Sequence, residues 1–175
     1  MPPKLPSFAE LLDSAQQSAV HLEMRDSYGV TAEADSFARW KETGAVDDDP
    51  ESPYWAPWTH LIRRIVSRGV VVRRARIVSE PVSDYIRYEY AGTGANVAAG
   101  EDVRWLPRRQ ASDIALPGND FWLIDGRLIR WNHFAGDGGS APGEISEDPA
   151  AARLCAEAFE AVWQRAIPHA EYKIS

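Results

Sequence analysis

The sequence predicts a single α/β (or α+β) domain, residues 1–175, built on a mixed β-sheet with helices packed on it. Short apolar runs with the period of a strand alternate with segments of helical spacing along the first two thirds of the chain. The last third carries a hairpin signal, Asp125-Gly126 between two apolar runs, which predicts a meander of antiparallel strands. A length of 175 residues suits one domain with a substantial core.

The first third predicts two helices, a strand and a polar loop. In chain order these are a helix at 7–19, a strand at 20–25, a helix at 31–43 and an acidic, proline-containing loop at 45–54. Ser7 and Glu10 form a capping box for the first helix, and Gly44 is a typical stop for the second. The strand alternates apolar and polar residues, so we expect it to be half-buried. We expect the acidic loop to be flexible.

The middle third predicts strands that alternate with helices. The segments are a helix at 55–68, a strand at 70–78, a helix at 82–91, a glycine-rich loop at 92–100, a strand at 102–106 and a short helix at 109–116. Residues 82–91 also fit a strand through Tyr88 and Tyr90, but we favour the helix. Gly92, Gly94 and Val97 fail the dinucleotide-binding pattern, because its third position requires glycine or alanine.

The last third predicts the hairpin, a further strand and a long helix. The hairpin strands are expected at 120–124 and 128–134, a turn at 136–139, a strand near 144–146 and a helix that begins after Asp148. Asp148 suits the N-cap, and Pro149 suits the first helical position. The buried face of this helix is expected to hold Leu154, Cys155, Ala158, Phe159, Val162 and Trp163.

Composition excludes several classes of protein. The formal net charge of −7 disfavours direct binding to nucleic acid or anionic membranes, and no recognition-helix pattern is evident. No run of about 20 apolar residues exists, and the N-terminal MPPKLPSFAELL does not match a secretion signal. With one cysteine, Cys155, no intramolecular disulfide can form. We therefore expect a cytoplasmic protein.

No complete catalytic or cofactor motif is present. Cys155 falls on an apolar helix face, there is no Gly-x-Ser-x-Gly, and the four histidines have no partner at metal-ligand spacing. We expect no metal and no cofactor. An enzyme, hydrolase or phosphodiesterase-like, remains the alternative. It would use Glu101, Asp120 and His133 for acid–base work and requires them to meet in one pocket.

Arginine and tryptophan supply the candidate binding residues. Six arginines within fourteen residues, with no acid among them, could bind an anion or a protein, or could pair with the acidic loop: Arg63, Arg64, Arg68, Arg73, Arg74 and Arg76. Most of the seven tryptophans fit the core, but one or two could line a ligand groove. At the rim formed by the first strand and the hairpin, the candidate ligand-binding residues are Arg25, Tyr28, Arg104, Trp122 and His133, with His21, Glu23 and Asp120 close by.

Four segments carry a family resemblance: LEMRDSYGV at 22–30, ARIVSEPVSDYIRYEY at 75–90, NVAAGEDVRWLPR at 96–108 and NDFWLIDGRLIRWNHFAGDG at 119–138. They resemble an uncharacterised actinobacterial family, a domain of unknown function. Members of that family look like cytoplasmic proteins encoded near small helix-turn-helix regulators. The resemblance implies a regulatory role, with a transcriptional regulator as a possible protein partner.

A second resemblance concerns the fold. The arginine-rich helix, Gly-Val-Val-Val entering a strand and the later Phe-Trp-Leu-Ile-Asp-Gly-Arg look like the phospholipase-D-like α/β fold. Catalytic members of that fold carry a His-x-Lys-x4-Asp motif. After His133 the lysine position holds Ala135, and Asp137 falls short of the aspartate position. The resemblance implies this fold without phosphodiesterase activity. Our leading hypothesis is a non-catalytic module that binds a protein partner or a small anionic ligand.

Overall fold

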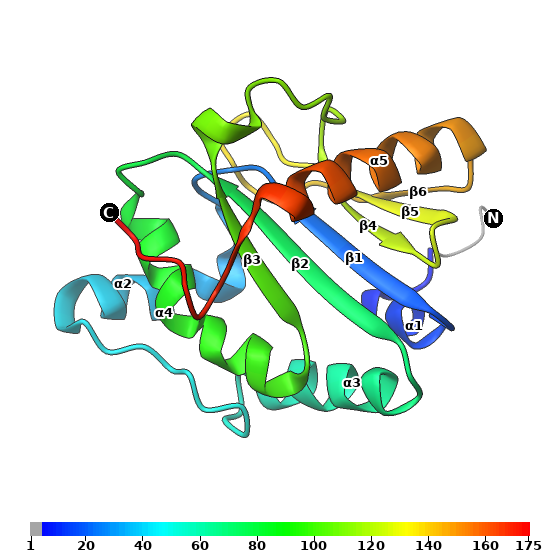
Figure 1. Ribbon diagram of the computed structural model, residues 1–175. Coiled ribbons are helices and arrows are strands. Elements are labelled where there is room, and N and C mark those ends of the chain that lie inside the picture. Colours follow the sequence, from blue (N-terminus) through cyan, green and yellow to red (C-terminus); the bar gives the residue numbers. More distant parts are fainter. Residues whose placement is uncertain (1–4) are drawn as a thin grey trace.

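A seven-stranded mixed sheet forms the centre of the protein (Figure 1). The computed structural model describes residues 5–175, so the first four residues of the segment tested for a secretion signal lie outside it. The strands are β1 Ser18–Glu23, β2 Val71–Val78, β3 Asp102–Pro107, β4 Asp120–Ile124, β5 Leu128–Asn132, β6 Glu144–Ser146 and β7 Ile167–Pro168. Their spatial order is β6-β5-β4-β1-β2-β3-β7. Only β1, β2 and β3 run parallel, and the other neighbours pair antiparallel. The predicted mixed sheet with its hairpin meander is confirmed.

The helices cover both faces of this sheet. They are α1 Phe8–Asp13, α2 Ala34–Thr43, α3 Ala56–Ser67, α4 Asp84–Ala99 and α5 Pro149–Arg165, with short 3-10 helices η1 Thr31–Glu33 and η2 Arg108–Ala111. α5 packs on one face, where Phe159 and Val162 meet Val20 and Phe121 in the largest apolar cluster. α1, α3 and α4 pack on the other face (Figure 1).

Because both faces are covered, β1 is buried on both sides. The expectation of a half-buried strand was therefore wrong: the polar residues His21 and Glu23 are only 5% and 7% exposed. Polar side chains facing inward under α3 and α4 need internal partners, since a buried charge without one is costly. These partners are described with the site below.

The first helix is shorter than predicted. It ends at Asp13 rather than at residue 19, and Ser14–Gln17 form a turn before β1. The capping box of Ser7 and Glu10 is confirmed. A residue distant in the sequence holds this turn. The Asp125 carboxylate accepts hydrogen bonds from the backbone N–H groups of Gln16, Gln17 and Ser18 at 2.7–3.1 Å.

Asp125 therefore joins two turns, and its replacement by alanine is expected to lower the free energy of unfolding by about 2 kcal/mol. Alanine removes the shared acceptor and also disfavours the positive φ of 53° that the β4–β5 turn requires. Asp125→Asn, which keeps one acceptor oxygen and tolerates that φ, should lose less. Urea denaturation of the three proteins measures this, and equal stabilities would show that the contacts contribute nothing.

The glycine-rich segment 92–100 is helical, which corrects the predicted loop. α4 begins after Ser83, whose hydroxyl caps Ile86 N–H, and continues to Ala99, where Gly100 ends it with a φ of 115°. Gly92 lies inside the helix, where a Cβ would make only an ordinary van der Waals contact with the Trp55 ring, at 3.5 Å. The sequence pattern alone did not separate a glycine inside a helix from a glycine of a loop.

Two smaller expectations also changed. Leu154 lies on the outer side of α5 and is 42% exposed, while the other residues predicted for its buried face are buried. The helix expected at 109–116 is only η2, and β7 was not predicted. The acidic loop 45–54 is tied to the helix that follows, because Trp55 Nε1 donates to the Asp47 carbonyl at 2.7 Å and Thr59 Oγ1 to the Pro50 carbonyl at 2.6 Å.

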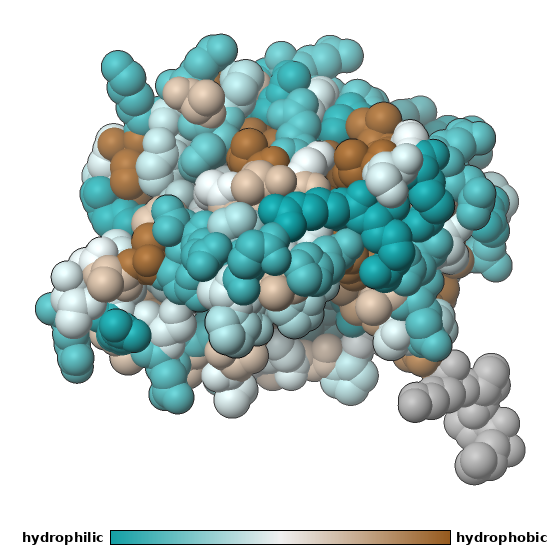
Figure 2. Space-filling model, turned by 90° about the horizontal axis from the view of Figure 1, so that it is seen from below, coloured by the Kyte–Doolittle hydropathy of each residue, from teal (hydrophilic) through white to brown (hydrophobic). Residues whose placement is uncertain are grey.

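The surface on the side of α3 and α4 is mostly hydrophilic, with small, separate hydrophobic areas (Figure 2). Among the described residues, none of the helices is both long and apolar enough to cross a membrane.

Candidate functional site

A cavity of about 640 Å³ lies between the sheet and the helices α3 and α4. The sheet contributes its floor, through His21, Glu23, Arg74, Arg76, Asp120 and Trp122. α4 contributes one wall, α1 and the start of α3 another, and the segments around Tyr28 and Val46 border it as well. The cavity therefore combines a charged floor with walls that are largely aromatic.

Strand register explains why the floor is polar. His21 pairs with Arg74 and Glu23 with Arg76 across the parallel strands β1 and β2. Successive side chains alternate between the faces of a strand, so these four share the α3/α4 face while their neighbours Leu22 and Ala75 enter the core under α5. An acid on one strand thus lies beside a base on the next.

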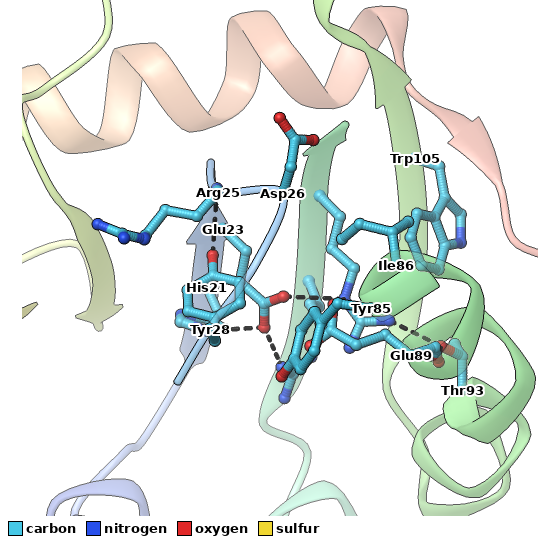
Figure 3. A network of polar contacts seen from close by, with 12 residues as sticks. His21, Glu23, Arg25, Asp26, Tyr28, Tyr85, Ile86, Glu89, Thr93 and Trp105 are labelled. Atoms are coloured by element: carbon cyan, nitrogen blue, oxygen red, sulfur yellow. Dashed lines mark hydrogen bonds and ion pairs between the residues drawn. The ribbon is translucent and has the colours of Figure 1, made fainter. Parts of the chain in front are cut away.

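Glu23 is the centre of a buried ion network, which Figure 3 shows between β1, β2 and α4. It accepts hydrogen bonds from Arg74 Nη1 and from Arg76 Nε, the latter at 2.9 Å, and its Oε1 lies 3.0 Å from His21 Nε2. Burial alone would raise the pKa of Glu23, but the positive charges of Arg76 and Arg74 hold it well below its usual range. Glu23 is therefore ionised and its oxygens are fully used.

The two arginines also have partners other than Glu23. Arg74 donates to both oxygens of Glu101, at 2.9 and 3.2 Å, and Trp58 Nε1 donates to the same carboxylate at 2.9 Å. Arg76 Nη1 donates to Thr93 Oγ1 on α4 at 2.7 Å. Burial opposes the charge of Arg74, yet Glu101 and Glu23 raise its pKa. Most donors of these guanidinium groups are therefore paired within the protein, while Arg76 Nη2 donates no hydrogen bond among the described residues.

His21 has both ring nitrogens in contact with oxygen. Nδ1 lies 2.8 Å from the carbonyl oxygen of Phe121, while Nε2 faces Glu23. The ring stacks on Trp122 with a centroid distance of 4.3 Å and an interplanar angle of 6°. The imidazole is thus held in place on both sides. The Trp122 ring also packs against Phe8 and Trp58 at the wall of the cavity.

Tyrosines connect the acids at the edge of the cavity. Tyr28 donates its hydroxyl to Asp120, which also accepts from Met24 N–H at 2.9 Å. Burial raises the pKa of Asp120, although the hydrogen bond from Tyr28 opposes this shift. Tyr85 donates to Glu33 at 2.6 Å. The carboxylates of Asp120 and Glu33 therefore accept hydrogen bonds from neutral donors.

Glu89 is the exception among the acids. Its Oε2 is buried without a hydrogen-bond partner and lies 3.8 Å from Arg76 Nε, too far for a hydrogen bond. Burial raises the pKa of Glu89 to about 8, against the pull of Arg76 and with help from Glu23 and Glu33. At neutral pH Glu89 is therefore mainly the uncharged acid, on a residue that lines the cavity.

The structure brings together some of the residues proposed from the sequence and separates others. Tyr28, Asp120 and Trp122 line the cavity. Glu101 lies behind Arg74 and Trp58. Arg25, His133 and Arg104 do not line the cavity. Arg25 stacks on Phe134 and points away from the ion network (Figure 3). His133 Nε2 is 3.6 Å from Glu144, and Arg104 covers Trp163 of α5.

The six arginines do not form one patch. Arg63 pairs with Glu51, and Arg64 and Arg68 with Asp13, on the outer side of α3. Arg73 turns to the α5 face and pairs with Glu160. Only Arg74 and Arg76 reach the cavity.

Sequence reasoning missed the contribution of α4. Glu89, Gly92 and Asn96 are spaced at successive helical turns and all line the cavity, as do Tyr85 and Tyr88. The spacing would have shown this shared face, had residues 92–100 been read as a continuation of the helix.

Two further findings concern the cysteine and metal binding. Cys155 is buried under α5, where burial raises the pKa of its thiol to about 12, so it is a core residue. Within residues 5–175, no group of three or more histidine, cysteine or acidic side chains is arranged to hold a metal ion.

Comparison with solved structures places the fold. The chain is similar to Nuc from Salmonella typhimurium, described as a phospholipase D family member, with a TM-score of 0.53 and 13% identity over 91% of this chain and 86% of that one. It also matches TrmBL2, an archaeal chromatin protein, with a TM-score of 0.46 and 12% identity over 91% of this chain and 47% of that one. The first likeness confirms the expected phospholipase-D-like fold and shows the fold alone.

At the level of sequence, no curated protein matches. A family does match, described as a domain of unknown function (DUF6879), and it covers residues 6–174. The match therefore confirms the resemblance to a domain of unknown function, and the chain belongs to this family, DUF6879.

Proposed function

We propose that this domain binds a small, uncharged organic molecule in the cavity between the sheet and α4, without transforming it. The observation that carries the proposal is the cavity itself: about 640 Å³, with an internally paired ionic floor and aromatic walls. Ligand sites typically enclose 300–1,000 Å³ and combine apolar walls with a few fixed polar groups. A concave site of this kind favours a small molecule over a protein surface.

The arginine content of the sequence suggested an anionic ligand, but the pairing of Arg74 and Arg76 within the protein favours an uncharged one. Arg74 and Arg76 have their hydrogen bonds directed at Glu23, Glu101 and Thr93. An incoming anion would have to compete with these carboxylates for the guanidinium charge. It would also approach the acids that line the cavity, which are Glu23, Glu33, Asp47, Glu89 and Asp120.

The arrangement gives little support to the enzyme alternative. That alternative required Glu101, Asp120 and His133 in one pocket, and only Asp120 lines the cavity. A general acid or base must also reach the substrate with a free proton or lone pair. Asp120 already binds Tyr28 and Met24 N–H. Regulation through a transcriptional regulator, as the family resemblance implies, stays a prediction.

Equilibrium dialysis against a polar metabolite extract, read by mass spectrometry, tests the proposal. The wild-type protein should enrich at least one small compound and return it unchanged after prolonged incubation. Val30→Trp places a large ring at a residue that lines the cavity and should abolish the enrichment. Val97→Trp is the matched control, because Val97 is exposed on α4 and does not line the cavity.

Two outcomes would contradict the proposal. Retention of the compound by Val30→Trp at the wild-type level would place binding elsewhere. Recovery of a chemically altered compound, dependent on the protein, would show catalysis and revive the enzyme alternative.

A further inference from the structure

We infer that Glu89 is a neutral hydrogen-bond donor that selects, for the cavity, an aromatic ligand carrying an uncharged carbonyl group such as an amide or lactam. This inference rests on the proposed function, since it assigns the ligand class of that site. It comes from the one acid of the cavity that the protein leaves without a partner.

The two oxygens of Glu89 differ in their surroundings. Oε2 is buried and 3.8 Å from the Arg76 guanidinium. Oε1 also makes no hydrogen bond among the described residues, but it is not among the buried atoms, and the side chain keeps 13% of its surface exposed. Since Glu89 lines the cavity, this remaining exposure belongs to a group that a ligand can reach.

The position of Arg76 indicates which oxygen of Glu89 carries the proton. A guanidinium can only donate, so it favours the carbonyl-type oxygen on its own side. The proton of the neutral acid therefore belongs on Oε1, from which it can be donated to a ligand. A carbonyl oxygen is the matching acceptor, whereas a ligand that offers only donors would leave this O–H unpaired.

The aromatic side chains around Glu89 define the rest of the ligand. Tyr85 and Tyr88 lie on the same helix, and Trp55 covers Gly92 one turn further along, so flat surfaces border the acid. Planar rings stack on such side chains with an offset or tilted geometry. A planar ring with an attached carbonyl would fill both requirements.

Charged and titratable groups of both signs face Glu89, and burial keeps it neutral against the pull of Arg76 and Arg74. They come from every element around it: Glu23 and His21 on β1, Arg74 and Arg76 on β2, Glu33 on η1, and the tyrosines Tyr28, Tyr54, Tyr85 and Tyr88. The tyrosine pKa values are all raised by burial, so these hydroxyls stay neutral as the pH rises. Between pH 7 and pH 9 the change at this wall is therefore the loss of the Glu89 proton.

Two probes of nearly equal shape separate a neutral from an anionic ligand: nicotinamide is neutral and nicotinate is an anion. Isothermal titration calorimetry at pH 7 should show binding of nicotinamide and at least tenfold weaker binding of nicotinate, as expected for a charge repelled by the acids of the cavity. Equal or tighter binding of nicotinate would overturn the inference.

Variants of Glu89 identify the donor. Glu89→Gln replaces the O–H by an amide N–H of the same reach, so it should keep nicotinamide affinity within about threefold. Glu89→Met keeps the length without a donor and should weaken binding about tenfold. Raising the pH from 7 to 9 should weaken wild-type binding about tenfold and leave Glu89→Gln unchanged. Equal affinities for the two variants would overturn the inference.

The two proposals fail in different ways. If the dialysis experiment recovers an uncharged compound without a carbonyl group that Val30→Trp excludes, the proposed function stands but Glu89 does not select a carbonyl. If no compound is recovered and no probe binds, both proposals fall.

Discussion

Replacing Arg74 by methionine is expected to lower the free energy of unfolding by about 3–5 kcal/mol, the usual effect of removing one partner from a buried ion pair. Arg74 is the link between two carboxylates, Glu23 and Glu101. The Glu101 side chain has no exposed surface, so it would be left as a buried charge with only Trp58 Nε1 as donor. Methionine keeps the apolar length but none of the donors.

Chemical denaturation measures this effect, with Arg64→Met as the matched control. Arg64 also donates two hydrogen bonds to a carboxylate, that of Asp13, but these side chains are 53% and 38% exposed. Exposed pairs typically contribute 0–1 kcal/mol, so the control should stay near wild type. The double variant Arg74→Met with Glu101→Gln should recover part of the loss. Similar stabilities for Arg74→Met and Arg64→Met would show that the network contributes little.

Glu89→Gln is expected to change how stability depends on pH. The pKa of Glu89 is about 8 in the folded protein, above the 4.5 of an ordinary glutamate. Between these values the unfolded chain releases the proton while the native state keeps it, so this group makes the wild type less stable as the pH rises. The slope is up to about 1.4 kcal/mol per pH unit. Below pH 4.5 and above pH 8 the contribution is constant.

The measurement is the difference in unfolding free energy between Glu89→Gln and wild type, from urea denaturation at several values between pH 5 and pH 9. Titrations of all other groups are shared and cancel to first order. The difference should grow in favour of the variant up to pH 8 and then level off. Parallel curves would show that Glu89 titrates normally in the native state.

The architecture followed from the sequence because its signals are local. Asp125-Gly126 adopts the two positive φ values that a tight hairpin requires, and Asp148 with Pro149 starts α5 as predicted. The cavity depends on features that are not local. Arg74 and Arg76 looked like a surface patch because strand alternation, without the helix cover, does not show which polar face is buried.

α4 shows the same limit at the level of single residues. Its hydrophobic and polar residues are distributed around the whole helix, because one side packs on the sheet while another lines the cavity. A one-sided apolar stripe, the usual sign of a helix, is therefore missing. With Gly92 and Gly94 present, residues 92–100 matched a loop, so the helix face that Glu89 shares with Gly92 and Asn96 was not recognised.

The separation of the two sheet faces has a consequence for how relatives of this protein can diverge. The α5 side is an apolar core that supports folding, and the cavity is confined to the opposite side. Changes in ring size or polarity along α4 and in the segments around Tyr28 and Val46 would therefore reshape the cavity while the α5 core and the Glu23 ion network stay intact. On the proposed function, such changes would alter which small molecule is bound.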